Sequence, residues 1–167
     1  MSLNPQADDA TAALAVQAGR ALLAAGLKLV TAESCTGGGV AAALTDVPGS
    51  SQWFERGYVT YSNAAKVADL GVEPAALERY GAVSAAVVEQ MAAGALRASG
   101  ADVAVAVSGI AGPDGGTPDK PVGLVFLAVQ RRGGAAQVSR EHFPGDRAAV
   151  RRAAVAAALR LVVQAAR

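Results

Sequence analysis

Apolar and polar positions alternate along the chain with two periods, one typical of helices and one typical of strands. Apolar residues at helical spacing predict a first helix that starts at Asp8 or Thr11 and ends at Gly26. The short apolar run 27–31 then predicts a strand. A glycine-rich turn follows it and leads into a second predicted helix over 38–45.

The middle of the chain repeats this order of strand and helix. Residues 57–61 combine β-branched and aromatic side chains and predict a strand. Ser62 or Asn63 can cap a short helix that contains Lys66, which places this lysine just beyond the end of a strand. Residues 74–80 predict a further short helix.

A longer helix and a buried strand come next. Ser84 can cap a helix over 85–99, and the continuous apolar run 103–107 is typical of a strand that is covered on both faces. The run opens into the glycine-rich segment 108–116, which predicts a loop.

The last third predicts a hairpin and a final helix. Strands over 122–130 and 137–143 flank Gly133 and Gly134, a hairpin signal that makes one strand antiparallel to its neighbour. Asp146 can cap the final helix. Its predicted inward stripe is formed by Val150, Ala154, Ala157, Leu161 and Ala165.

Strands that alternate with helices predict an α/β fold, here a three-layer α/β/α sandwich with a mixed, mostly parallel sheet. No repeat or linker divides the chain, so residues 1–167 are expected to form one domain. Ligands of such sheets bind beyond the carboxyl ends of the strands. Ser34, the segment 61–66 and the loop that starts at Ser108 are all predicted to lie there.

Composition excludes several classes of protein. The net charge of +1 and a charged fraction of 17% argue against an electrostatic grip on nucleic acid. One cysteine, Cys35, and one histidine, His142, exclude a disulfide framework and a Cys/His zinc cluster within one chain, and we expect no metal. No leader-like or membrane-spanning apolar run occurs, which predicts a soluble, cytoplasmic protein.

The segment 32–39 (AESCTGGG) is the strongest candidate for a reactive turn. Three glycines let the backbone approach a ligand closely, and amides at a helix start can hold a developing negative charge. Ser34 stands where a nucleophile would. A helix cap is the plainer interpretation, and Cys35 or a pair of Ser34 with His142 are alternative nucleophilic arrangements.

Several ordered motifs resemble the CinA C-terminal domain family, the nicotinamide-nucleotide amidohydrolase group. The matching blocks are 31–38 (TAESCTGG), 49–63 (GSSQWFERGYVTYSN) with Lys66, 81–84 (GAVS), 108–116 (SGIAGPDGG), 120–123 (KPVG) and 143–147 (FPGDR) with Val150 and Arg151. They cover nearly the whole chain. Leu124 departs from the pattern, because a polar threonine is expected there.

The resemblance implies a mixed-sheet α/β/α domain, often dimeric and without a cofactor. Family members hydrolyse the carboxamide of nicotinamide mononucleotide to nicotinate mononucleotide and ammonia. Longer relatives carry an N-terminal domain similar to molybdopterin-binding proteins, and this chain is expected to lack it.

Amide hydrolysis needs a nucleophile, a base and stabilisation of an oxyanion. We expect Ser34 to attack, with Lys66 as its base and Tyr61 as a proton relay. A lysine can accept a proton only when it is neutral, so burial or a nearby positive charge must lower its pKa. Lys28 and Lys120 are less suitable, since the first starts a strand and the second lies in a loop. An ordinary solvated cation is the alternative for Lys66.

The oxyanion is expected to bind backbone N–H groups of Thr36, Gly37 and Gly38, although a glycine-tolerant turn would have the same sequence.

The substrate phosphate needs cationic or amide partners, and Arg147 beside the predicted cap Asp146 can supply them. A surface salt bridge is the alternative for Arg147. The remaining expected substrate contacts are Ser108, Gly109, Gly112 and Asn63.

A non-catalytic module that senses nucleotides or binds a partner is the competing functional hypothesis. It would keep the cleft without needing Lys66. No Gly-Lys-Ser or Gly-Lys-Thr occurs, which argues against a nucleoside triphosphatase.

Overall fold

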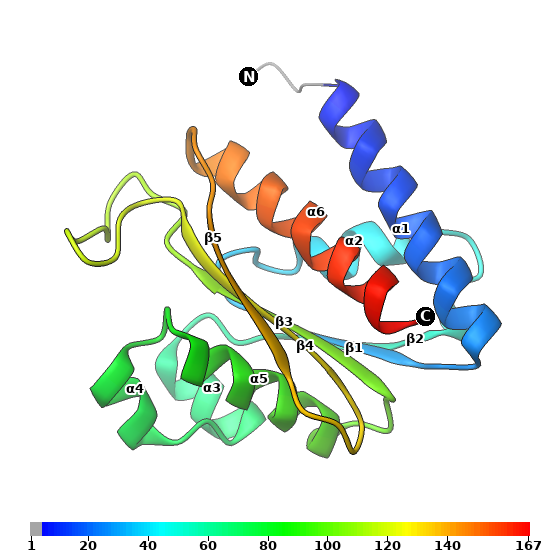
Figure 1. Ribbon diagram of the computed structural model, residues 1–167, viewed down its shortest axis with the longest axis horizontal. Helices are drawn as coiled ribbons and strands as arrows, with labels where there is room; N and C mark the ends of the chain where they lie inside the picture. Colours follow the sequence, from blue (N-terminus) through cyan, green and yellow to red (C-terminus); the bar gives the residue numbers. More distant parts are fainter. Residues whose placement is uncertain (1–4) are drawn as a thin grey trace.

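The computed structural model of the protein has three layers, with one sheet between two layers of helices (Figure 1). It describes residues 5–167. The sheet has five strands in the order β2-β1-β3-β4-β5. In chain order the strands are β1 (Leu29–Glu33), β2 (Phe54–Val59), β3 (Val103–Gly109), β4 (Leu124–Arg131) and β5 (Gln137–His142).

Strand direction brings the neighbouring carboxyl ends of β1, β2 and β3 to one edge of the sheet. β1 pairs in parallel with β2 and with β3, whereas β3 with β4 and β4 with β5 are antiparallel pairs. Of the described strands, only β4 therefore runs against the others. Glu33 at the end of β1 lies opposite Val59 of β2 and Val107 of β3. The predicted mixed, mostly parallel sheet is confirmed.

Each face of the sheet carries its own helices (Figure 1). One face is covered by α1 (Pro5–Ala25), α2 (Gly39–Thr45) and α6 (Arg147–Ala165). The other is covered by α3 (Asn63–Leu70), α4 (Pro74–Tyr80) and α5 (Ala85–Ala98). A short 3-10 helix over Ser50–Gln52 precedes β2. The predicted three-layer sandwich is confirmed.

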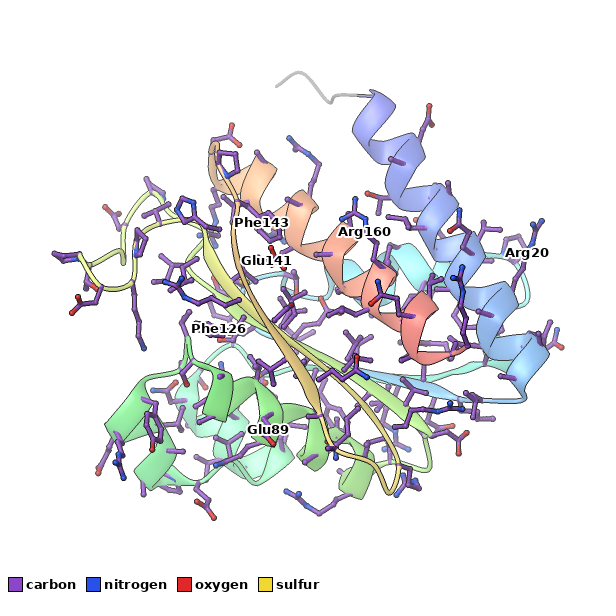
Figure 2. All side chains as sticks on the ribbon, viewed as in Figure 1. Arg20, Glu89, Phe126, Glu141, Phe143 and Arg160 are labelled. Atoms are coloured by element: carbon purple, nitrogen blue, oxygen red, sulfur yellow. The ribbon has the colours of Figure 1, made fainter. Side chains whose placement is uncertain are left out.

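Side-chain size differs between the two faces. Alternating residues of β3 direct valines, such as Val105, into the cluster beneath α1 and α6, and alanines, such as Ala104 and Ala106, into the cluster beneath α5. The aromatic residues divide in the same way, since Phe143 packs against the first cluster and Phe126 against the second (Figure 2). Small residues let α5 pack closely on the sheet.

The helices α3 and α5 also meet at close range. A Cβ added to Gly94 of α5 would overlap the carbonyl oxygen of Leu70, the last residue of α3. Arg97 of α5 donates to the same carbonyl from Nη2 at 3.2 Å. This contact fixes the position of α3, which carries Lys66.

The boundaries of two strands differ from the prediction. β1 begins two residues later than the run 27–31, because the N–H of Leu27 still bonds the carbonyl of Leu22 and closes α1. β2 begins at Phe54 rather than at residue 57 and ends before Thr60, whose carbonyl leaves the sheet to accept a side-chain hydrogen bond.

The two terminal helices differ as well. α1 begins at Pro5, earlier than Asp8 or Thr11. Val150 and Ala154 of α6 are buried as predicted, but Ala157, Leu161 and Ala165 are only partly buried. The deeper positions are Val155, Ala158, Leu159, Val162 and Val163. The buried face is wide because α6 packs on both the sheet and α1. In residues 5–167 no helix combines the length and apolar character needed to cross a membrane.

Candidate active site

Ser34 begins the turn that leaves β1, at the edge where three strand ends meet. Its N–H donates to the carbonyl of Val107 on β3 at 3.0 Å, and the carbonyl of Glu33 accepts from the N–H of Thr60 beyond β2 at 2.9 Å. The turn is thus tied to both neighbouring strands. Ser34 is 9% exposed, so its hydroxyl lies at the border between the core and solvent.

Lys66 brings its ammonium nitrogen to this hydroxyl. Ser62 caps α3 by accepting from the N–H of Ala65, and Lys66 follows on the buried side of the helix with 1% exposure. Its Nζ donates to Ser34 Oγ at 3.0 Å and to the carbonyl of Thr60 at 2.6 Å. The structure therefore brings together the serine and lysine that the sequence selected.

Burial also sets the protonation of Lys66. Desolvation lowers the pKa of the Lys66 ammonium from its ordinary value of 10.5, and the nearby Cys35 opposes this shift. No carboxylate forms an ion pair with Lys66 among the described residues. A lysine in this environment more readily loses its proton and can then accept one from the serine hydroxyl.

The competing nucleophiles and bases lie in unsuitable surroundings. Cys35 is 5% exposed, and burial raises the pKa of its thiol to about 11, which keeps it protonated. His142 on β5 pairs with the carbonyl of Val122 at 3.0 Å, and β3 and β4 separate β5 from β1. Lys28 faces Glu55, and Lys120 donates to the carbonyl of Tyr80.

Glu33 is a buried residue of the site that sequence reasoning did not select. Its carboxylate is fully buried and accepts from the N–H groups of Gly38 at 3.0 Å, Val40 at 3.0 Å and Ala41 at 2.8 Å. A carboxylate at this position satisfies the first amides of α2 and complements the helix dipole. An acidic residue at the end of an otherwise apolar strand was the available signal.

Arg151 of α6 holds the other side of the turn and was also missed. Its Nε donates to the carbonyl of Cys35 at 3.2 Å and its Nη2 to the carbonyl of Thr36 at 3.0 Å. The bonded residues are separated in the sequence by 116 and by 115 positions, and helical periodicity does not reveal contacts over such a separation. The turn is therefore held by a carboxylate at its amides and a guanidinium at its carbonyls.

Two of the three amides expected to bind an oxyanion are already occupied. The N–H of Gly37 donates to the carbonyl of Ser34, and that of Gly38 donates to Glu33. The φ angles of 59° and 92° at these glycines explain why the turn needs them. Within the part of the chain that the structure describes, the N–H of Thr36 has no acceptor.

Arg147 connects two segments that the sequence predicted to share the site. It donates from Nη1 to the carbonyl of Gly112 at 2.8 Å and from Nη2 to Tyr61 Oη at 3.0 Å. The Tyr61 phenol is thus bonded to Arg147, while Lys66 meets only the Tyr61 carbonyl, at 3.4 Å. A proton relay through Tyr61 stays a prediction. Asp146 caps α6 as predicted, accepting from the N–H of Ala149.

The other expected substrate contacts have different environments. Ser108 is buried and its hydroxyl donates to the carbonyl of Ala82 at 2.8 Å, so its proton is already committed. At Gly109 a Cβ would lie 2.7 Å from Val125, which gives this glycine a packing role. Asn63 is exposed at the first position of α3. Leu124 is buried, so its departure from the family pattern falls in the interior.

A hollow beside the Ser34 turn is not centred on Ser34. It has a volume of about 560 Å³, lies among α1, α2 and α6, and touches the turn through Thr36, Gly39 and Arg151. Neither Ser34 nor Lys66 lines it. The contact between Lys66 and Ser34, and not this hollow, therefore identifies the candidate site. No three His, Cys, Asp or Glu side chains of the described chain are grouped so as to hold a metal ion.

Comparison with known proteins assigns this architecture. The CinA C-terminal domain model matches residues 11–166. Nicotinamide-nucleotide amidohydrolase PncC of Escherichia coli (strain K12) is 56% identical over 151 residues, which are 90% of this chain and 92% of that protein. The protein of the same name from Pseudomonas putida is 56% identical over 153 residues, 90% and 94% of the two chains.

A solved structure agrees over nearly the full length. The crystal structure of competence/damage inducible protein CihA from Agrobacterium tumefaciens has a TM-score of 0.92 to this structure and 45% sequence identity, and the match covers 98% of each chain. Sequence and structure give the same result, and the chain belongs to the CinA C-terminal domain family.

Proposed function

We propose that the protein hydrolyses the carboxamide of nicotinamide mononucleotide, releasing ammonia and nicotinate mononucleotide. The observation that carries the proposal is the 3.0 Å contact between Lys66 Nζ and Ser34 Oγ in a buried setting. Such a pair is the nucleophile and base that amide hydrolysis needs. The names of relatives at 56% identity support the substrate.

Acylation starts from the neutral amine of Lys66. The amine takes the proton of Ser34 Oγ while Oγ bonds to the carboxamide carbon, and the carbonyl π electrons move to oxygen. The N–H of Thr36 is the candidate donor to that oxyanion. When the oxyanion collapses, the C–N bond breaks, and the nitrogen takes the proton from Lys66 and leaves as ammonia.

Deacylation repeats these transfers with water. Lys66 takes a proton from water as the water oxygen bonds to the acyl carbon, and the second tetrahedral intermediate collapses with cleavage of the C–O bond to Ser34. The proton on Lys66 returns to Ser34 Oγ, and the nucleotide leaves as a carboxylic acid that ionises in water. Each step uses the same base in alternating roles.

Substrate binding is proposed for the segments joined by Arg147. Its guanidinium is exposed and lies at the start of α6, where an arginine and helix amides can share a phosphate. Asn63 and the loop that includes Gly109 and Gly112 would line the nucleotide, with Ser108 accepting a substrate hydroxyl. Tyr61 would hold Arg147 in place by accepting its hydrogen bond.

Ammonia release from nicotinamide mononucleotide tests the proposal directly. Wild-type protein should form ammonia and nicotinate mononucleotide in equal amounts, and Ser34→Ala should form neither above the uncatalysed rate. Ser51→Ala is a matched control, since Ser51 is exposed in the 3-10 helix before β2. Absence of product with the folded wild-type protein would refute the proposal.

A non-catalytic sensor is the second candidate, and the competence/damage name of the Agrobacterium tumefaciens protein favours it. This alternative expects nicotinamide mononucleotide to bind with equal affinity to wild-type protein and Lys66→Met, with no turnover by either. Isothermal titration beside the ammonia assay separates the two.

Three broader expectations accompany the proposed activity. We propose that residues 1–167 act as one domain, that the protein works in the cytoplasm, and that it forms a homodimer. Light scattering of the purified chain tests the last of these.

A further inference from the structure

The amides of the Ser34 turn differ in what they are free to do. Gly37 donates to the Ser34 carbonyl, Gly38 to Glu33, and Gly39 to the Thr36 carbonyl. The N–H of Thr36 has no acceptor in residues 5–167. Among the three amides expected to bind an oxyanion, those of Thr36, Gly37 and Gly38, the Thr36 amide is the one that can take this role without first breaking another hydrogen bond.

Arg151 determines where that amide points. The peptide unit between Cys35 and Thr36 is trans, so its carbonyl and its N–H point in opposite directions. Arg151 Nε binds the Cys35 carbonyl at 3.2 Å, and the Thr36 N–H must therefore point away from α6.

The next peptide unit, between Thr36 and Gly37, has the same orientation, and here the acceptor of the N–H is seen. Arg151 Nη2 binds the Thr36 carbonyl at 3.0 Å, and the N–H of the same unit, on Gly37, points away from Arg151 to the Ser34 carbonyl. The Gly37 N–H thus faces the side of the turn on which the Ser34 carbonyl lies, and the Thr36 N–H faces away from Arg151 in the same manner.

A guanidinium can hold two successive peptide units in one orientation, whereas the single ammonium group of a lysine cannot. Arg151 donates from two nitrogens to two successive carbonyls, and the planar fork fixes both peptide units at once. Donation of a charged group to a carbonyl also polarises the peptide and strengthens its N–H as a donor. The next part of the turn is held by the Glu33 carboxylate, which accepts from the N–H groups of Gly38 and Val40.

We infer that Arg151 is a positioning residue for catalysis, because it aims and polarises the Thr36 amide that stabilises the oxyanion formed at Ser34. The inference rests on the proposed amidohydrolase function for its natural substrate. The test of this inference does not require that substrate, because any reagent that places a negatively charged oxygen beside Ser34 needs the same hydrogen-bond donor.

The kinetic test compares Arg151→Met, Arg151→Lys and the neighbouring control Arg152→Met. Loss of an oxyanion donor lowers kcat by about 10²- to 10³-fold in known enzymes. We expect a kcat decrease of about 10²-fold for the methionine variant and about 10-fold for lysine, with KM changed by less than about threefold. Arg152, for which no hydrogen bond is found in the described chain, should show neither change.

A thioamide analogue of nicotinamide mononucleotide separates positioning from general damage. Sulfur is larger than oxygen and a weaker acceptor, so an intact donor favours the amide over the thioamide. The ratio of the two rates should fall in Arg151→Met and partly recover in Arg151→Lys. A folded Arg151→Met with kcat within threefold of wild type overturns the inference, as does a kcat loss with an unchanged ratio. If the methionine variant does not fold, the lysine variant decides by the same criteria.

A fluorophosphonate probe tests the role of Arg151 independently of the identity of the natural substrate. Ser34 Oγ bonds to phosphorus, fluoride leaves, and the hydroxyl proton passes to Lys66, while the phosphoryl oxygen occupies the oxyanion position. Labelling of Ser34 should be about 10- to 100-fold slower in Arg151→Met, in line with the expected kcat loss. Wild type that labels but does not release ammonia refutes the proposed substrate alone. Equal labelling rates for wild type and variant refute the role of Arg151.

Discussion

The chain leaves the sheet at the same edge after β1 and after β3, but the segments that follow these two parallel strands differ in burial and in hydrogen bonding. After β1 the chain makes a buried turn whose amides and carbonyls are held by Glu33 and Arg151. After β3 it enters a long loop whose residues 113–119 are all exposed. The difference is consistent with the proposed roles, in which Ser34 of the restrained exit reacts and the open exit contributes to substrate binding.

The direction of the next element explains the contrast. α2 starts at Gly39, so the turn after β1 coincides with the start of a helix and its amides need acceptors. The loop after β3 must instead reverse the chain into the antiparallel β4. It has few fixed partners, and the contact of Arg147 with the Gly112 carbonyl is one of them.

The largest effect is expected when the proposed base, which lies on α3 and contacts Ser34 of the restrained exit, is removed. Lys66→Met should lower kcat/KM by about 10³-fold or more while the chain still folds, since methionine matches the length and apolar stem of lysine. Steady-state ammonia release with circular dichroism on the same samples checks this. The matched control Lys28→Met alters an exposed lysine before β1 and should retain activity. Activity near wild type in Lys66→Met would exclude this lysine as the base.

The same lysine predicts how activity varies with pH. Because burial lowers the pKa of Lys66 below 10.5, kcat/KM should rise with pH about tenfold per unit and level off before pH 10.5. A flat profile, or a limb that continues to 10.5, would contradict the neutral amine as base.

Stability should follow the same titration. Between the folded pKa and 10.5 the unfolded chain binds a proton that the folded chain does not, so wild type gains stability relative to Lys66→Met as pH rises. Urea unfolding at several pH values measures the difference, which should be constant below the folded pKa.

A smaller effect is expected from loosening the turn at its amides. Glu33→Gln replaces one acceptor oxygen by an NH₂ group that faces backbone donors, and should reduce the free energy of unfolding by about 2–4 kcal/mol. The kcat should fall about 10-fold. Urea unfolding and ammonia release measure the two effects. Glu55→Gln, a change in a partly exposed carboxylate on β2, should alter neither by a comparable amount.

Loss of the α6 residue that contacts the open exit should change KM rather than kcat. Arg147→Met removes the cation that joins Tyr61 to the Gly112 carbonyl, and we expect KM for the mononucleotide to rise about 10-fold with kcat within about threefold. Arg160→Met, on an exposed position of the same helix (Figure 2), is the control. A loss confined to kcat would place Arg147 with the reacting groups and end the division between the two exits.

Sequence patterns were sufficient to predict the layers and the proximity of Ser34 and Lys66. Ser34 and Lys66 each follow a predicted strand, and parallel pairing of β1 and β2 brings their ends together. Glu33 and Arg151 escaped because their partners are backbone atoms, which every residue has, so no pairing of residue types marks them. The predicted strand 27–31 also stopped two residues before β1 ends at Glu33, since a charged residue at a strand end resembles the start of a loop.

Gly94 of the α5 helix restricts which substitutions the protein tolerates, although it belongs to neither the proposed reacting groups nor the proposed binding groups. Gly94 meets the carbonyl of Leu70, and Lys66 lies one helical turn before Leu70. A single methyl group at position 94 would push α3 outward and carry the lysine with it. In a survey of all single substitutions, this distant glycine should tolerate replacement as poorly as Ser34, for lack of space alone.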